Sequence, residues 1–415
     1  MIATRLIYLL TGCLTILPYS IFCQKTPDVN ILKGIAYSAR QQNDSVIYYL
    51  EMAGDRKDAY PEAYIYYGNA LMAKGQNLLA ISKFMKAEKM EQGIASYWIA
   101  KSYARMGELD NALEYLKINI KSKYSEQESK ILLDPDFQKF EKNIEWEEFW
   151  RNTPDHTTLE NVLFEADYNL KSANYTEALE IINEGLKKGL RKNLLYSKRA
   201  EIYLAMNNNK MAVSDLDKAI EGDTRNPVLY ARRASLSNNL GRYRQALEDY
   251  NIAIKYAPLN LELYKGRANA GNGSGLYESA IADIDYYLSF FPEDHDAWYQ
   301  SGLIHMSNKK YLNALGSFNK ALELNRNNSN YFSARGETYM QTKTYRYAWN
   351  DFSMALDINP VNPKIYLLKG IAAMNLGNLN DACYSFDMAR KQGSFEVIEY
   401  INSYCEKNGR TKIEN

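Results

Sequence analysis

Four arginines have the spacing and the partners to do ionic chemistry, either on a bound anion or within the protein. Each precedes an aspartate by 16 residues, and the pairs are Arg199 with Asp215, Arg233 with Asp249, Arg267 with Asp283, and Arg335 with Asp351. A guanidinium can form two parallel hydrogen bonds with one carboxylate. Because an acid accompanies each of these arginines, the spacing favours internal ion pairs over a basic ladder that binds an anionic ligand.

Other reactive residues are scattered along the chain. His156, His295 and His305 have no metal-ligand spacing with each other or with cysteine. The sequence shows no Ser–His–Asp set and no paired acids with a defined cleft. Residues 271–275 (Gly-Asn-Gly-Ser-Gly) resemble a phosphate loop only superficially, and we expect a loosened hairpin turn there. The sequence therefore predicts a protein that is not an enzyme, with no catalytic residues, no cofactor and no metal.

Composition points in the same direction. The 415 residues include 50 Lys and Arg against 50 Asp and Glu, so no net field steers the chain toward nucleic acid or an anionic membrane. The 35 tyrosines suit half-buried positions between stacked elements, with the ring inside and the hydroxyl at water. We expect an extended protein with a thin core, whose partners are other proteins and not nucleic acid.

The first residues have the pattern of an export signal. Arg5 precedes an apolar run over residues 6–22, which is short for a membrane span. We expect residues 1–23 to be a signal peptide that is cleaved after Cys23. Lipidation at Cys23, which Phe22 disfavours, and a retained anchor are the alternatives. The expected location is the periplasm or cell envelope, without membrane insertion after cleavage; peripheral association with the envelope or outer membrane is an alternative.

Two cysteines, Cys383 and Cys405, remain after cleavage. In an exported protein they could form a disulfide. We favour instead two small, buried, unpaired side chains in the last helices.

The chain repeats itself with a period of 34 residues. Seven alanines follow that period, namely Ala178, Ala212, Ala246, Ala280, Ala314, Ala348 and Ala382. Positions are counted from the first residue of each 34-residue unit, and the first of these seven units starts at residue 159. Ala or Gly stands at position 8 and the repeated Ala at position 20. Mostly large residues stand at positions 4, 17 and 24. Small residues allow two helices to cross closely, and large ones fill the space around the crossing. Each unit is therefore predicted to be a helix, a tight turn and a second helix.

These columns resemble the tetratricopeptide repeat, which also places Pro near position 32. The resemblance implies an all-α, right-handed superhelix, a solenoid of about ten helical hairpins. Seven contiguous units are expected over residues 159–396 and about three degenerate ones over residues 27–124. A capping helix and tail are expected over residues 397–415, because the last unit would otherwise expose an apolar face.

Residues 125–158 interrupt the period. They contain an Asp-Pro-Asp-Phe stretch at 134–137 and several Trp and Phe residues. A similar stretch occurs in many bacterial members of the family that the repeats resemble. We expect a helical spacer whose aromatic side chains close the core between the two blocks. An exposed aromatic patch for a partner is the alternative.

The resemblance also implies a concave groove lined by first-helix positions such as 2, 5, 6, 9 and 13. Its candidate residues change from polar and basic to apolar and aromatic along the chain; they are Lys198, Arg232, Asn238, Asn239, Lys265, Asn269, Tyr299, Gln300, Leu303, Leu367, Leu368 and Ile371. Such a surface suits an extended peptide or a helix of another protein.

The expected function is a non-catalytic protein-binding scaffold of the bacterial cell envelope. The alternatives are a chaperone-like holder of exported clients and an accessory repeat subunit of a secretion or motility complex or of an enzyme partner. A pull-down separates them, because a scaffold retains one stoichiometric partner and a holder retains many.

Overall fold

The computed structural model describes residues 27–152 and 157–406, so the expected signal peptide lies outside the described residues. All regular elements in these ranges are helical, and most form antiparallel hairpins. The ten hairpins are α1 (Val29–Ala39) with α2 (Asn43–Met52), α3 (Pro61–Ala73) with α4 (Asn77–Met90), α5 (Ser96–Met106) with α6 (Leu109–Lys121), α10 (Thr157–Lys171) with α11 (Tyr175–Lys187), α12 (Lys192–Ala205) with α13 (Asn209–Gly222), α14 (Pro227–Asn239) with α15 (Tyr243–Tyr256), α16 (Glu262–Gly273) with α17 (Tyr277–Leu288), α18 (His295–Ser307) with α19 (Tyr311–Leu324), α20 (Ser329–Gln341) with α21 (Tyr345–Ile358), and α22 (Pro363–Asn375) with α23 (Leu379–Lys391). The predicted all-α superhelix of stacked hairpins is confirmed.

Shorter elements connect or end these hairpins. They are a 3-10 turn η1 (Gly54–Ala59), the helices α7 (Glu128–Leu132), α8 (Pro135–Gln138), α9 (Ile144–Asn152) and α24 (Ile398–Tyr400), and a final helical segment η2 (Ile401–Glu406). Over the ranges 27–152 and 157–406, none of the helices combines the length and the apolar character that a bilayer crossing requires.

Each repeat turns at one residue with a positive φ angle, at position 15 of the unit. This residue is glycine in some hairpins, such as Gly241 with φ 71°, and a larger residue in others, such as Asn207 with φ 57°. Gly275, with φ 77°, occupies the same place in its unit. Because α16 continues through Gly273 and then makes the ordinary turn, the predicted loosening at residues 271–275 is wrong.

Positions 8 and 24 of a hairpin touch and are matched in size. A Cβ atom added to Gly302 would lie 2.4 Å from Cε1 of Phe318, and one added to Gly370 would lie 2.4 Å from Cε1 of Phe386. Where position 24 holds a smaller side chain, as at Leu216, position 8 is alanine, here Ala200, and both are buried. Most hairpins therefore keep a similar volume at the helix crossing by pairing Gly with Phe and Ala with Leu or Ile. The exceptions are Gly34 with Leu50 and Ala234 with Tyr250, whose ring packs against Gly266 of the next hairpin.

The insert packs on the hairpin that precedes it. Phe137, Phe140 and Trp146 are buried and form one apolar cluster with residues of α5 and α6, such as Ala100 and Leu116. The expected closure of the core between the two blocks is seen on one side only, since these three side chains are buried against the first block. Their cluster caps the first block of hairpins and contains no residue of the second block.

The C-terminal end is closed by η2. Ile401 and Cys405 are buried against the last hairpin, whereas Phe395 is 77% exposed. Cys383 of α23 and Cys405 form a disulfide, with Cα atoms 5.7 Å apart. The favoured prediction of two unpaired cysteines is therefore wrong. Both side chains are buried, as that prediction required, but the turn after α23 also brings their sulfur atoms together.

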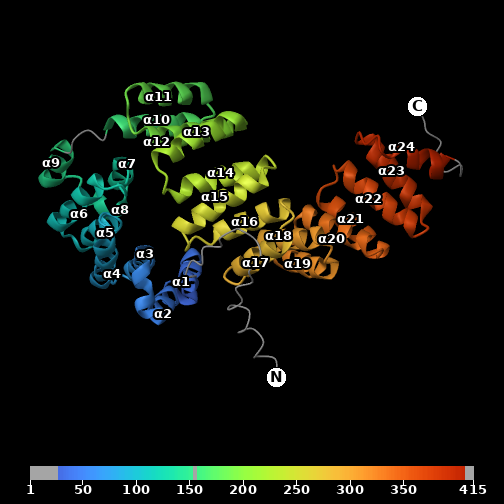
Figure 1. Ribbon diagram of the computed structural model, residues 1–415, viewed down its shortest axis with the longest axis horizontal. Coiled ribbons are helices and arrows are strands. Elements are labelled where there is room, and N and C mark those ends of the chain that lie inside the picture. The colour runs from blue at the N-terminus through green and yellow to red at the C-terminus, as the bar shows by residue number, and fades with distance from the viewer. Residues whose placement is uncertain (1–26, 153–156, 407–415) are drawn as a thin grey trace, which may run out of the picture.

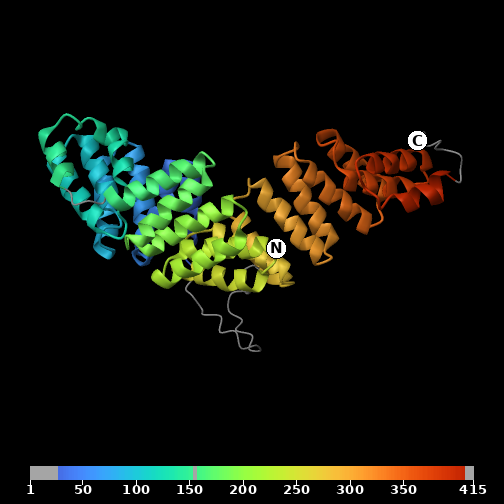
Figure 2. The same cartoon turned by 90° about the horizontal axis from the view of Figure 1, so that it is seen from above.

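The superhelix closes on itself once. Figure 1 shows α1 beside the α15–α17 region, with the intervening hairpins and the insert forming a ring. Buried residues of α1–α4, such as Ile31 and Phe84, share one apolar cluster with Leu259, Tyr287 and Phe290. We call residues 29–291 the ring and residues 295–406 the arm, which extends away from the ring in both views (Figures 1 and 2).

Candidate interaction surface

The Arg–Asp pairs form as the spacing predicts. In all four, the arginine Nε donates to Oδ2 and Nη2 to Oδ1 of the aspartate 16 residues later. Arg233 and Asp249 are typical, at 2.9 and 2.7 Å.

 The Asp249 side chain is buried at 3% exposure, and the guanidinium of Arg233 is 18% exposed. Hydrogen bonds from both nitrogens to Asp249 raise the pKa of Arg233 above its ordinary value. The prediction of internal ion pairs is confirmed, so these arginines are not available as an anion-binding ladder.

Each of these arginines has a second partner, and a third hydrogen bond, that the sequence pattern was not used to predict. Its Nη1 donates to a side chain at position 25 of the preceding hairpin, at distances between 2.6 and 2.8 Å; the acceptors are Asn183, Asp217, Asn251 and Asn319. One arginine therefore joins the two helices of its own hairpin and also joins that hairpin to its neighbour. The recurring Asn or Asp at position 25 is visible in the sequence and could have identified this contact.

The basic candidates of the groove are neutralised by neighbouring acids. Lys198 bonds Asp167 of the preceding first helix at 2.7 Å and Glu201 at 2.6 Å. Arg232 pairs with the same Glu201. These contacts join position 6 of one first helix to position 9 of the helix before it, so they link successive hairpins.

Lys265 is held in a similar way. Its ammonium lies 2.9 Å from Glu262 and 3.1 Å from Asp294, and 4.7 Å from the centre of the Tyr287 ring. Gln300 donates to the backbone oxygen of Lys265 at 2.9 Å. The basic side chains of the expected groove therefore lie on the first helices, but acidic side chains of the same chain balance their charges.

The three asparagine candidates differ in exposure. Asn238, at position 12, is only 8% exposed and donates to the backbone oxygen of Gly266 at 3.3 Å. Asn239 and Asn269 are exposed on their helices. Of the three, only the latter two present their side chains to solvent.

The candidates of the arm form an apolar and aromatic stretch. The Tyr299 ring stacks on Tyr331, with centroids 4.9 Å apart, and lies 5.8 Å from Phe318. Leu303 packs beside them, and Leu367, Leu368 and Ile371 pack on the cluster of the last hairpins. All five candidate side chains are half-buried, so each keeps part of its apolar surface in contact with solvent.

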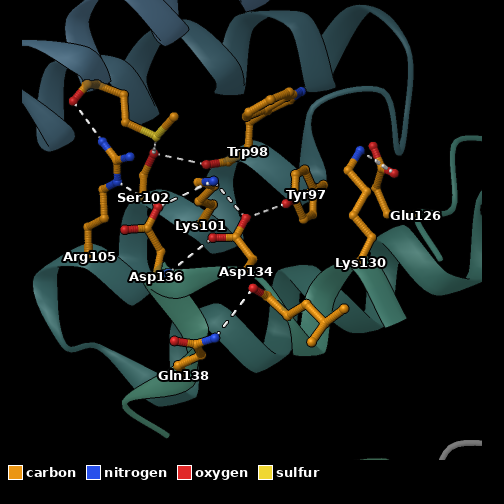
Figure 3. A network of polar contacts seen from close by, with 12 residues as sticks. Tyr97, Trp98, Lys101, Ser102, Arg105, Glu126, Lys130, Asp134, Asp136 and Gln138 are labelled. Carbon is orange, nitrogen blue, oxygen red and sulfur yellow. Dashed lines mark hydrogen bonds and ion pairs between the residues drawn. The ribbon is translucent and has the colours of Figure 1, made fainter. Parts of the chain in front are cut away.

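One first helix already holds a bound segment, and that segment belongs to the same chain. On α5, Tyr97, Lys101 and Arg105 stand at positions 5, 9 and 13 of the repeat unit that starts at residue 93. All three contact the start of α8 (Figure 3). Asp134 accepts hydrogen bonds of 2.6 Å from both the Tyr97 hydroxyl and the Lys101 ammonium. Asp136 accepts one of 2.8 Å from Arg105.

Burial and hydrogen bonding set the charges in this contact. Burial alone would raise the pKa of Asp134, but hydrogen bonds from Lys101 and Tyr97 and from the backbone N–H of Asp136 hold it below its usual value. Burial and the bond to Asp134 raise the pKa of Tyr97, so its hydroxyl keeps the proton that it donates. Phe137 follows directly and is fully buried. The α5 face thus holds the acidic N-terminal end of a short helix, α8, together with its aromatic anchor.

No group of three or more His, Cys, Asp or Glu side chains is placed to hold a metal ion in the part of the chain that the structure describes. His156, one of the three histidines considered above, lies outside that part.

Comparison with known proteins agrees with the hairpin geometry. Two family models, both described as tetratricopeptide repeat, match residues 239–295 and 295–328. No curated protein matches the sequence significantly.

Solved structures share the fold at low sequence identity. A tetratricopeptide repeat protein from Parabacteroides merdae is 19% identical, with a TM-score of 0.50 over 59% of this chain and 97% of that one. The C-terminal part of a repeat-containing protein from Cytophaga hutchinsonii is 18% identical, with a TM-score of 0.45 over 57% and 98% of the two chains. PilW, a type IV pilus biogenesis factor, is 18% identical, with a TM-score of 0.46 over 50% and 98%. The matched repeats and the stacked hairpins together identify this chain as a tetratricopeptide repeat protein.

Proposed function

We propose that this protein is a non-catalytic scaffold that binds an extended peptide or a helix of a partner protein along its first helices. The observation that carries the proposal is the contact between α5 and the segment 134–137. There, first-helix positions 5, 9 and 13 hold the N-terminal end of a short helix through two carboxylates and one buried aromatic ring. The same positions in the other hairpins offer the same kind of surface with different side chains.

The arm is the part of this surface that suits a partner best. Tyr299, Leu303, Leu367, Leu368 and Ile371 lie half-buried on first helices, and their apolar atoms would lose contact with water on binding. In the ring, by contrast, Lys198, Arg232 and Lys265 are already paired with acids. A partner segment with apolar side chains at helical or extended spacing fits the arm.

The proposed location is the bacterial cell envelope. Two features support it, namely the export-signal pattern of residues 1–23 and the disulfide between Cys383 and Cys405. Disulfides form and persist in oxidising compartments such as the periplasm.

The test is affinity capture from an envelope extract with three forms of the chain. Leu368→Asp places a charge on the first-helix face of the arm. Leu312→Asp makes the same change on α19, where the side chain is 81% exposed. We expect the wild type and Leu312→Asp to retain one stoichiometric partner and Leu368→Asp to lose it, with all three showing the same helical circular dichroism.

The other outcomes are informative. Equal capture by the three forms would move the binding surface away from the arm, and no captured protein would count against the scaffold altogether. Many substoichiometric proteins would instead indicate a holder of exported clients.

A further inference from the structure

A cavity of about 510 Å³ lies where the ring closes. One wall comes from α1 and α3, with Ile35, Glu62 and Tyr66. The other wall comes from the turns before α16 and after α17, with Leu259, Glu262 and Phe291. Its volume is in the range of small-ligand sites, which often lie between parts of a protein that are distant in sequence. None of the candidate groove residues lines it.

The titratable side chains that the structure describes in the cavity lining include acids but no bases. Its lining includes two carboxylates, Glu62 and Glu262, and no Lys, Arg or His among the described residues. Glu262 is balanced by Lys265, at 2.9 Å, and accepts a hydrogen bond of 2.7 Å from the Tyr287 hydroxyl. In the described part of the chain, Glu62 has no such cation. Glu62 keeps contact with solvent, and its partial burial together with Glu91 raises its pKa. A cation that enters the cavity would stabilise the ionised form of this carboxylate.

Apart from Ser38 and Asn260, the rest of the lining is apolar or aromatic. Tyr66 and Phe291 contribute rings, and Ile35, Leu259 and Leu261 contribute aliphatic surface. Phe291 already accepts a guanidinium at its ring, since the Arg40 side chain lies 5.5 Å from the ring centre. Aromatic faces attract cations, and apolar walls favour a hydrocarbon stem.

We propose that this cavity binds an organic cation, an ammonium or guanidinium group on a short apolar stem, with Glu62 as its counter-ion. The cation is either a free amine or the Lys or Arg side chain of another protein, because both present the same group on the same kind of stem. The site lies on first helices of the ring but contains none of the arm residues of the proposed partner surface, so its test and the capture experiment on the arm can fail independently.

The test is isothermal titration of the purified chain with butylguanidinium and with butylurea, which has the same shape but no charge. We expect saturable binding of the cation and at least about tenfold weaker binding of the urea, because a hydrogen bond to a charged group contributes about 1.5–3 kcal/mol. An acetylated and amidated pentapeptide, Ala-Ala-Arg-Ala-Ala, serves as the second probe. Binding of the peptide alone identifies a protein side chain as the source, and binding of butylguanidinium alone identifies a small amine.

Two variants assign the binding to the cavity. Glu62→Gln removes the unbalanced carboxylate, and we expect it to weaken the cation at least about tenfold. Glu248→Gln removes the same charge from an exposed position on α15 outside the cavity and should leave the affinity unchanged. The proposal is overturned if neither probe binds, if butylurea binds as well as the cation, or if Glu62→Gln binds like the wild type while its thermal melt shows a folded chain.

Discussion

Arg233 and Asp249 are joined by two parallel hydrogen bonds across one hairpin, and the same arginine reaches Asp217 of the preceding hairpin at 2.7 Å. The same arrangement recurs at Arg199, Arg267 and Arg335. A buried carboxylate, two helices and two hairpins thus depend on one guanidinium.

We expect Arg233→Ala to lower the free energy of unfolding by about 3 kcal/mol, because it leaves the buried Asp249 carboxylate without a counter-ion. Arg233→Lys should recover only part of this loss, since an ammonium cannot form the two parallel bonds. The neighbouring Arg232→Ala is the control. Its side chain is 41% exposed, and we expect a loss of about 1 kcal/mol or less. Urea unfolding of the three variants measures the differences, and an unchanged midpoint for Arg233→Ala would contradict the structural role.

The size match between positions 8 and 24 predicts that Gly302→Ala destabilises the chain by about 1–3 kcal/mol, because the new methyl group would meet the Phe318 ring. Adding Phe318→Leu should restore part of the loss, since Ala200 and Leu216 are the natural pair of that size. Gly316→Ala is the control, because nothing lies within 4 Å of its added Cβ atom. Thermal melts compare the variants. Equal melting temperatures for Gly302→Ala and Gly316→Ala would show that a methyl group fits between position 302 and the Phe318 ring.

The disulfide predicts a redox-sensitive C-terminal end. It closes a loop of 22 residues, for which chain entropy gives a stabilisation of about 3 kcal/mol. We expect dithiothreitol to lower the melting temperature of the wild type and to leave a Cys383→Ala/Cys405→Ala double variant unchanged. Mass spectrometry of the untreated protein after thiol alkylation checks the bond directly. Two alkylated cysteines at these positions would rule it out.

The Asp134 contact predicts a dependence on pH. Its folded pKa is depressed, so its contribution to stability is present above the unfolded pKa of about 4 and is lost as the pH falls through the lower folded value. We expect Asp134→Asn to be less stable than the wild type by about 2 kcal/mol at pH 7, and the two to converge at acidic pH. Urea unfolding between pH 7 and pH 3 measures this convergence. A constant difference over that range would mean that the ionised carboxylate is not what stabilises the contact.

The closure of the ring predicts that Arg40, directly after α1, protects a distant turn. Arg40 donates to the backbone oxygen of Phe290 at 2.6 Å and pairs with Glu293. We expect Arg40→Ala to increase hydrogen exchange in α1 and in the turn after α17. Lys74→Ala removes an exposed ion pair with Asp44 inside the first block and should leave that turn protected. Exchange that is the same in both variants would mean that the apolar cluster alone holds the ring closed.

The 34-residue period carries most of the fold and part of the site. The helix pairs, their crossings and the Arg–Asp pairs all lie within one 34-residue unit. The residue types that recur at fixed positions of the unit therefore predict each of them. The contact of Arg233 with Asp217 joins neighbouring units, and its prediction also needs the offset between stacked hairpins. Pairing of Cys383 with Cys405 could not be decided from the sequence, because burial and disulfide formation favour the same apolar surroundings. The charge of Lys198 is balanced in part by Asp167 of the preceding first helix, α10. Predicting this contact requires knowing how one hairpin stacks on the next.

The ion pair between Arg40 and Glu293 spans 253 positions of sequence, in a kind of protein whose contacts are otherwise local. Bringing two such distant points together costs a flexible chain about 5 kcal/mol of entropy in a simple loop-closure estimate. During synthesis, the first hairpin therefore cannot form its contacts with the turn after α17 until that turn has been made. High contact order in the ring and low contact order in the arm should give two folding speeds in one chain, with the arm fraying from its end and the ring opening in a single cooperative step.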